Sequence, residues 1–288
     1  MAQAALDRIK AEFDALPREL KRAARWVADN PADVCVLSMR EQARRADVVP
    51  PTLARLAHAV GFTSYAALRD DFRVHLRWSA GDFSARAESM QAGQRTSRHY
   101  LDDLGRLQET DVASLALLND AALFQRVARL LLKSRTTAFL GFRSCHSVAL
   151  HAHYLYSMLT GRGALLQDAY GTLHESIATL GPGSALLAIG LSPYSRQTVD
   201  AVRRAQARGA AVVALTDSEL SPLARSADLR LLFEAASSSF FHSLVAAHAL
   251  VERLMAEVAL RGGKPVVRRL REREALLSET NAYWDGAR

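Results

Sequence analysis

Two stretches of the sequence combine hydroxyl side chains with a position that suits anion binding. Residues 141–147 read Gly-Phe-Arg-Ser-Cys-His-Ser, and residues 190–198 read Gly-Leu-Ser-Pro-Tyr-Ser-Arg-Gln-Thr. Each follows an apolar run and leads into a predicted helix, so hydroxyls and unpaired amides meet at a helix N-terminus. Neither is a Walker P-loop or a GxGxxG motif, which favours a phosphomonoester over a nucleotide. The candidate ligand-binding residues are Ser144, Ser147, Ser192, Tyr194, Ser195 and Thr198; the alternative is that such residues only cap helices.

A second candidate site lies in the first 78 residues and is of the kind that binds DNA. Apolar periodicity predicts helices over 18–29, from Ser38 to about Ala46, from Pro50 to Val60 and from Ser64 to about Trp78. Ser38 and Glu41 form a capping box, in which Glu41 reaches back to the start of its helix. Two short helices joined by a tight turn are typical of a helix-turn-helix.

The candidate DNA-binding residues lie on the two helices and at the start of the next. Thr52, Arg55 and His58 are expected to project away from the buried face, toward the major groove. The others are expected at the phosphate backbone, and the full set is Arg44, Arg45, Thr52, Arg55, His58, Ser64 and Tyr65. The alternative is a small helical bundle that docks a protein partner.

The rest of the chain alternates strands with helices. Apolar runs predict strands at 136–141, 164–167, 184–189, 211–215 and 229–233, and a last helix from about Phe240 to Leu260. This alternation predicts a parallel sheet with both faces covered. Ligands of such sheets bind beyond the carboxyl ends of the strands, where both hydroxyl-rich stretches lie. Residues 79–96 are predicted to be a linker with some helix, and 100–131 long amphipathic helices that pack on the second domain or form a dimer interface.

Other residues could in principle support catalysis, metal binding or redox chemistry, but their pattern is weaker evidence than that for the two candidate sites above. His174 and Glu175 could supply the general base of an aldose–ketose isomerase, although both are expected on a helix surface. His146, His151 and His153 lie close in sequence, but on one helix only His146 and His153 lie nearly on the same face, whereas His151 is displaced by roughly 200° from His153 at about 100° per residue. Cys145 stands near a helix N-terminus, which can lower a thiol pKa and suit a redox role, but the default expectation is a buried small residue. We expect no catalytic residue, no metal and no cofactor.

Composition limits the class of protein. The chain has 288 residues, a formal charge of +7 and 49% hydrophobic residues, so it can bury a globular core and can attract a polyanion. Two cysteines exclude a disulfide scaffold. The first twenty residues lack the apolar stretch of a secretory signal, and no run is long and apolar enough to span a membrane. We therefore expect a cytoplasmic protein with no membrane partner.

Four segments resemble the MurR/RpiR family of bacterial transcriptional regulators. Residues 16–73 resemble the family's helix-turn-helix region. The C-terminal part resembles its sugar isomerase (SIS) domain, most specifically in "GFRSCHSVALHAHYLYSML", "LLAIGLSPYSRQTVDAVRRAQARGAAVVALTDSELSPLARSADL" and "SSSFFHSLVAAHALVERLMA". The chain departs from the family where Val49 replaces the usual serine cap, where Gly190 replaces a serine and at Pro193-Tyr194.

The resemblance implies an α-helical DNA-binding domain followed by a five-stranded parallel α/β sandwich. It assigns residues 1–78 to the helix-turn-helix domain, 79–122 to a linker and helical connector, 123–265 to the SIS domain and 266–288 to a tail. It further implies a homodimer or homotetramer that binds operator DNA. The SIS domain would bind a phosphorylated sugar or related carbohydrate derivative and alter DNA affinity.

Overall fold

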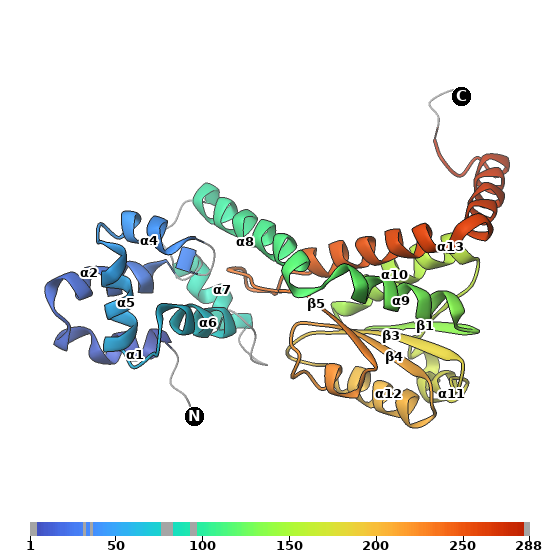
Figure 1. Ribbon diagram of the computed structural model, residues 1–288, viewed down its shortest axis with the longest axis horizontal. Helices are drawn as coiled ribbons and strands as arrows, with labels where there is room; N and C mark the ends of the chain where they lie inside the picture. Colours follow the sequence, from blue (N-terminus) through green and yellow to red (C-terminus); the bar gives the residue numbers. More distant parts are fainter. Residues whose placement is uncertain (1–4, 31–32, 35–36, 76–82, 93–96, 285–288) are drawn as a thin grey trace. The chain divides into compact units, whose positions relative to one another are not determined.

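The computed structural model describes residues 5–30, 33–34, 37–75, 83–92 and 97–284, which form two compact units (Figure 1). The first unit comprises residues 1–111 and 236–243, and the second comprises 112–235 and 244–288. The predicted fold class is confirmed, because a helical N-terminal unit precedes a unit with a five-stranded parallel sheet. Cys35 and the predicted helix end at Trp78 lie outside the described residues.

The first unit is built from helices around one apolar core. Buried Leu53, Leu56 and Val60 put one face of α5 against its neighbours. The helix at residues 5–12 was not predicted from the sequence. The elements are α1 (Ala5–Glu12), η1 (Phe13–Ala15), α2 (Arg18–Asp29), α4 (Met39–Arg45), α5 (Pro50–Ala59), α6 (Tyr65–His75), α7 (Phe83–Ala92) and the first part of α8 (Ser97–Leu118).

The predicted helix-turn-helix is present as α4 and α5, and its ends are fixed by local hydrogen bonds. The Ser38 hydroxyl accepts a hydrogen bond from the Glu41 amide at 3.3 Å, as a cap should. The other half of the predicted capping box is wrong, because the Glu41 carboxylate binds Arg44 and Arg45 instead. Gly61 ends α5 as predicted: its φ of 82° is a left-handed conformation that glycine adopts without strain.

The second unit is a five-stranded, wholly parallel sheet in the order β2-β1-β3-β4-β5. Helices α9, α10 and α13 cover one face, and α11 and α12 cover the other (Figure 1). The strands are β1 (Thr136–Leu140), β2 (Ala164–Leu165), β3 (Ser184–Gly190), β4 (Ala211–Thr216) and β5 (Leu229–Leu232). The helices are α9 (Ala121–Lys133), α10 (Cys145–Thr160), η2 (Ala169–Gly171), α11 (Leu173–Ala178), α12 (Arg196–Ala207), η3 (Ala224–Ser226) and α13 (Val245–Glu279).

Side-chain alternation divides the core of the second unit into two layers. In β3, Leu187 packs on the α10/α13 side while Leu186 and Ala188 pack on the α12 side. All seven residues of β3 are buried, which explains why its sequence reads as a continuous apolar run. The predicted last helix starts too early, because α13 begins at Val245; Gly263, with a φ of 60°, interrupts it close to the predicted end at about Leu260, and helical residues then continue to Glu279. No helix in the described part of the chain is long and apolar enough to cross a membrane.

Candidate functional site

The two hydroxyl-rich loops lie beside each other at the carboxyl edge of the sheet. β1 and β3 are parallel neighbours, and β2 lies on the opposite side of β1, so the strand order switches at this pair. Residues 141–144 follow β1 and residues 191–195 follow β3, and α10 and α12 begin directly after these loops. Two helix N-termini thus meet at the position where parallel α/β sheets bind ligands, and both favour an anion.

The loop after β1 passes very close to the helix that follows it. A Cβ atom on Gly141 would lie 2.4 Å from the carbonyl oxygen of Cys145, so only glycine fits there. Arg143 is exposed and adopts a φ of 56°. Ser144 stands at the N-cap position of α10 without a side-chain capping bond, whereas the Ser147 hydroxyl donates to the Ser144 carbonyl at 2.9 Å. The interpretation of Ser144 as a plain helix cap is therefore wrong.

A buried carboxylate from the next strand holds the loop after β3. Asp217 directly follows β4 and is 6% exposed. Its oxygens accept hydrogen bonds from the Ser192 amide at 3.2 Å, the Tyr194 hydroxyl at 2.7 Å and the Thr216 hydroxyl at 3.3 Å. The sequence interpretation missed Asp217, although a polar residue at the carboxyl end of an apolar strand was the available signal. Tyr194 therefore supports the loop through this carboxylate.

Two further predicted ligand residues stand at the start of α12. Ser195 occupies the N-cap position, is half-buried, and makes no side-chain capping bond. Among the described residues its hydroxyl has no hydrogen-bond partner, so it is available to a ligand. Thr198 is 1% exposed and packs into the unit. The description of Ser195 as a helix cap is wrong, and the ligand role of both residues stays a prediction.

Burial of Cys145 raises the pKa of its thiol to about 11. Hydrogen bonds with the Leu191 backbone and the Ser144 side chain oppose this shift but do not outweigh burial. The default interpretation of Cys145 as a buried small residue is confirmed, since it is 6% exposed, and the helix N-terminus does not lower the pKa of its thiol. Because Cys145 follows one loop and Leu191 belongs to the other, their hydrogen bond joins the two halves of the site.

Two of the three clustered histidines contact different groups. His151 Nδ1 lies 3.1 Å from Nδ1 of His248 on α13, and His153 Nε2 lies 3.4 Å from the Gly163 carbonyl oxygen. No group of three metal-ligating side chains occurs in the parts of the chain that the structure describes. His174 and Glu175 are exposed on α11, as expected of a helix surface.

The candidate DNA-binding residues divide into exposed and buried groups. Arg55 and His58 are exposed and share a face of α5 with exposed Pro51, since these positions are four and seven residues apart. Thr52 is 1% exposed and Tyr65 is 3% exposed. The expectation that Thr52 projects away from the buried face is wrong. Its hydroxyl instead accepts a hydrogen bond from the Arg55 guanidinium at 3.2 Å.

Tyr65 and Ser64 stabilise the helical unit itself. The Tyr65 hydroxyl donates to the side-chain oxygen of Gln42, whose amide donates to the Val34 and Leu37 carbonyl oxygens at 3.1 and 2.7 Å. Ser64 caps α6 by accepting from the Ala67 amide at 3.0 Å. The sequence interpretation did not identify the network around buried Gln42.

Arg44 and Arg45 are exposed and already hold a carboxylate. Hydrogen bonds from Arg44, and then from Arg45, lower the pKa of Glu41 to about 2. Arg45 also pairs with Asp33 at 3.0 Å. A phosphate that bound these guanidiniums would compete with Glu41 and Asp33. Arg55 has no such ion pair among the described residues and is better placed to bind an external acceptor.

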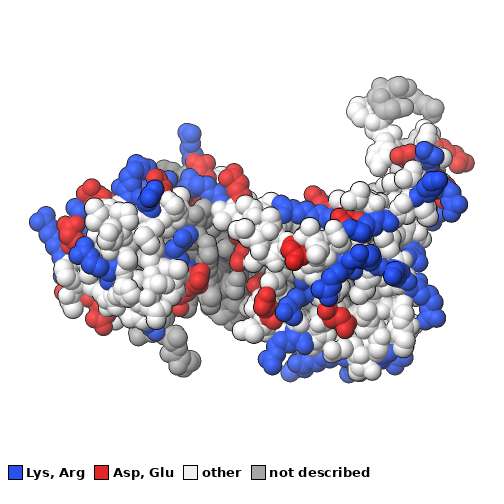
Figure 2. Space-filling model, in the orientation of Figure 1, with Lys and Arg blue, Asp and Glu red and all other residues white. Residues whose placement is uncertain are grey.

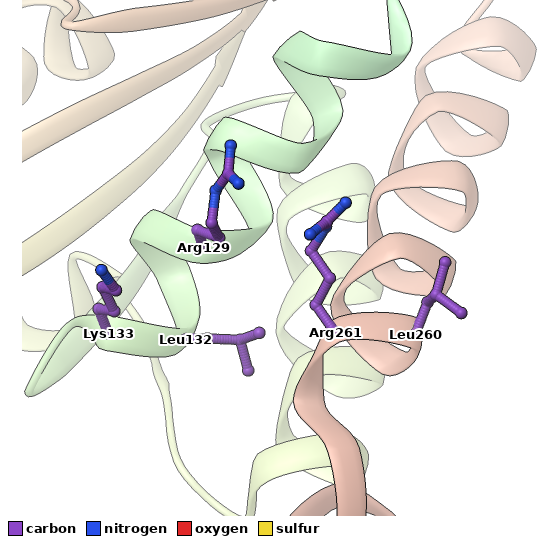
Figure 3. A pocket seen from close by; sticks show the side chains of 5 residues that line it. All are labelled: Arg129, Leu132, Lys133, Leu260 and Arg261. Atoms are coloured by element: carbon purple, nitrogen blue, oxygen red, sulfur yellow. The ribbon is translucent and has the colours of Figure 1, made fainter.

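A basic cavity of about 520 Å³ lies between α9 and α13, where Lys and Arg side chains gather on the visible face of the second unit (Figure 2). Figure 3 shows Arg129 and Lys133 on α9 and Arg261 on α13 around it. Because α9 ends at Lys133 and β1 begins at Thr136, this cavity is near the amino end of β1. None of the candidate ligand residues lines it.

Comparisons with known proteins agree with this architecture. Residues 130–256 match the SIS domain family. An uncharacterized HTH-type transcriptional regulator from Caldanaerobacter subterraneus, TTE0211, is 25% identical over 91% of this chain and 92% of its own length. The sugar isomerase domain of an RpiR transcription factor from Sphaerobacter thermophilus is 24% identical, with a TM-score of 0.58 over 61% of this chain and 98% of that one.

Residues 130–256 form a SIS domain. These likenesses agree with the resemblance of the chain to RpiR-family regulators, in which a helix-turn-helix precedes a SIS domain. The fold of the whole chain is also similar to Vibrio vulnificus NanR, a protein solved in complex with ManNAc-6P. That structure is 18% identical, covers 96% of this chain and 98% of NanR, and has a TM-score of 0.54.

Proposed function

We propose that this chain binds operator DNA through α5 and regulates transcription in response to a phosphorylated sugar or related metabolite bound at the β1/β3 switch point. The observation that carries the proposal is the position of two helix N-termini beyond neighbouring strand ends, beside the Ser195 hydroxyl, which no residue in the described part of the chain bonds. A phosphate group is an anion with several acceptor oxygens, which is what amides and hydroxyls in this arrangement bind.

The likeness to NanR supports a sugar phosphate as the first class of ligand to test, since that protein binds ManNAc-6P. Ser144, Ser192 and Ser195 are the residues that we assign to the phosphate, and Asp217 and Tyr194 are assigned to support of the loop. Operator DNA would place the protein in the cytoplasm. Binding of the metabolite would change DNA affinity through a coupling free energy of about 1–3 kcal/mol.

The ligand half of the proposal is tested by isothermal titration of the purified full chain with N-acetylmannosamine 6-phosphate, glucose 6-phosphate, inorganic phosphate and the unphosphorylated sugars. We expect the phosphorylated sugars to bind and Ser195→Ala to weaken them by about tenfold, the cost of one hydrogen bond to a charged group. Ser278→Ala, at an exposed position on α13, is the matched control. Equal binding of phosphorylated and unphosphorylated sugars would contradict the proposal, and turnover of a sugar phosphate would favour an isomerase.

The DNA half is tested by fluorescence anisotropy with the upstream region of the gene and an unrelated duplex. Arg55→Ala should cost about 1–3 kcal/mol of specific binding, because a base-reading arginine contributes that much discrimination. Arg230→Ala, an exposed position on β5, should leave affinity unchanged. If both variants bind the upstream region as tightly as the unsubstituted chain, α5 does not read the operator.

A further inference from the structure

Two histidines on different helices face each other within the second unit. Nδ1 of His151 on α10 lies 3.1 Å from Nδ1 of His248 on α13, and the ring centres are 5.2 Å apart. Both residues are half-buried. Because α10 and α13 pack against each other in the same core, the fold sets the separation of the two rings. The sequence interpretation missed this pair, since the two residues are 97 positions apart.

The hydrogen bonds of Ser147 determine which ring nitrogen of His248 carries a hydrogen. The Ser147 hydroxyl donates its single hydrogen to the Ser144 carbonyl oxygen at 2.9 Å. Toward Nε2 of His248, at 3.5 Å, this hydroxyl can therefore only accept. Nε2 of His248 thus carries the hydrogen, and Nδ1 of the neutral ring keeps the lone pair that faces His151. Burial, and then the charge of His151, lower the pKa of His248, which favours that neutral ring.

The separation of the two Nδ1 atoms suits a transition-metal ion. Neutral imidazole is the commonest metal ligand in proteins. Zinc–nitrogen bonds of about 2.0–2.1 Å place two ligands of a tetrahedral ion roughly 3.3–3.4 Å apart. The 3.1 Å between Nδ1 of His151 and Nδ1 of His248 is close to this value. An ion would replace the hydrogen that His151 now donates to His248, and this hydrogen would move to Nε2 of His151.

The surroundings of the pair favour a cation and hold one ring in place. Glu252 follows His248 by one turn of α13, and its negative charge raises the pKa of His248 against the effect of burial. The same charge would attract a divalent cation. Ser147 accepts a hydrogen bond from Nε2 of His248, which fixes the orientation of the ring, as the hydrogen-bond partner of a metal-bound histidine does. Imidazole ligands favour Zn²⁺, Cu²⁺ or Ni²⁺ over Mg²⁺ and Ca²⁺.

We propose that His151 and His248 bind a zinc ion through their Nδ1 atoms, between α10 and α13. Water and the exposed Glu252 carboxylate would complete the coordination. The proposal departs from the sequence-based expectation of no metal, which considered His146, His151 and His153 on a single helix. It does not depend on the proposed function of either unit.

The test is isothermal titration of zinc chloride into the purified, untagged full chain after removal of metals with EDTA. We expect one zinc ion to bind per chain. His151→Ala and His248→Ala should each weaken binding by at least about 100-fold, because each removes a metal ligand. Ser147→Ala removes only the support of one ring and should weaken binding by about tenfold. His174→Ala, at an exposed position on α11, is the matched control and should bind zinc as the unsubstituted chain does.

Two measurements on the unsubstituted chain test the site even if a variant folds poorly. Zinc that binds only the native chain should raise the midpoint of thermal unfolding, whereas magnesium should not. Protonation of either ring removes a ligand, so zinc affinity should fall by at least about tenfold from pH 7.5 to pH 5.5. A chain that binds no zinc, equal affinity at both pH values, or binding that both histidine variants retain would each overturn the proposal.

Discussion

Asp217 shows that some residues of the candidate site hold its loops in place, whereas others are left to contact a ligand. It follows β4, yet its carboxylate fixes the loop after β3 through Ser192 and Tyr194. The candidate hydroxyls could be predicted from the sequence because they precede helices. Which of them is free could not, since Tyr194 is bonded by Asp217, which follows another strand, and Thr198 is buried. Ser195 is available to a ligand because no residue in the described part of the chain bonds its hydroxyl.

His248 gives the second unit a predictable dependence on pH. Burial, and then the nearby charge of His151, lower the pKa of His248, while Glu252 opposes the shift. Ser147 also faces its ring. Below the unfolded pKa of about 6.5 the unfolded chain binds a proton that the native ring resists. The free energy of unfolding should therefore fall as the pH drops through that range, and level off below the native pKa.

Urea unfolding between pH 7.5 and 5 measures this effect. His248→Gln should flatten the decline, whereas His174→Gln, at an exposed position on α11, should leave it unchanged. If the free energy of unfolding falls equally with pH in the unsubstituted chain and in both variants, groups other than His248 cause the loss of stability in acid.

Two glycines in helical and loop segments should respond oppositely to the same substitution. Gly141→Ala places a Cβ atom 2.4 Å from a backbone oxygen at the junction of β1 and α10, and should lower stability by about 1–3 kcal/mol. Gly105→Ala, inside α8 with no atom within 4 Å of the added carbon, should raise it by about 0.5–1 kcal/mol. Chemical unfolding of the two variants and of the unsubstituted chain measures both changes. Similar midpoints in the two variants would mean that the loop after β1 rearranges to accept the added carbon.

Elements proved more predictable than their ends. Continuous apolar runs identified all five strands because both faces of the sheet are covered, and the order of β1 and β3 then brought the two loops together. The Ser38 cap and Gly61 were local signals and were confirmed. Glu41 failed as a capping residue because Arg44 and Arg45 compete for its carboxylate. The helical residues beyond the break at Gly263 were missed, because a glycine with a φ of 60° followed by Pro265 separates them from the first part of α13.

For the whole molecule, the homodimer that the family resemblance implies would bring two recognition helices to the operator, and the proposed DNA binding would then require two half-sites. The half-sites should lie about 34–36 Å apart, or a multiple of this, along one face of the duplex. Inserting five base pairs between footprinted half-sites should weaken binding strongly, and inserting ten should restore part of it. Insensitivity to spacing would indicate that a single helix-turn-helix suffices.

The eight residues 236–243 have a consequence for how the protein can be divided. They lie between β5 and α13 in sequence, but they pack with the first unit: Arg86 donates to the Ser237 and Ser239 carbonyl oxygens at 3.3 Å, and Phe83 stacks on Phe241 with ring centres 5.6 Å apart. The polypeptide thus passes between the two units three times, and neither unit is a single continuous segment of the sequence. A fragment excised at residue 112 would carry a phenylalanine-bearing loop whose binding partner had been cut away, and it should prove less soluble than a fragment with that loop shortened.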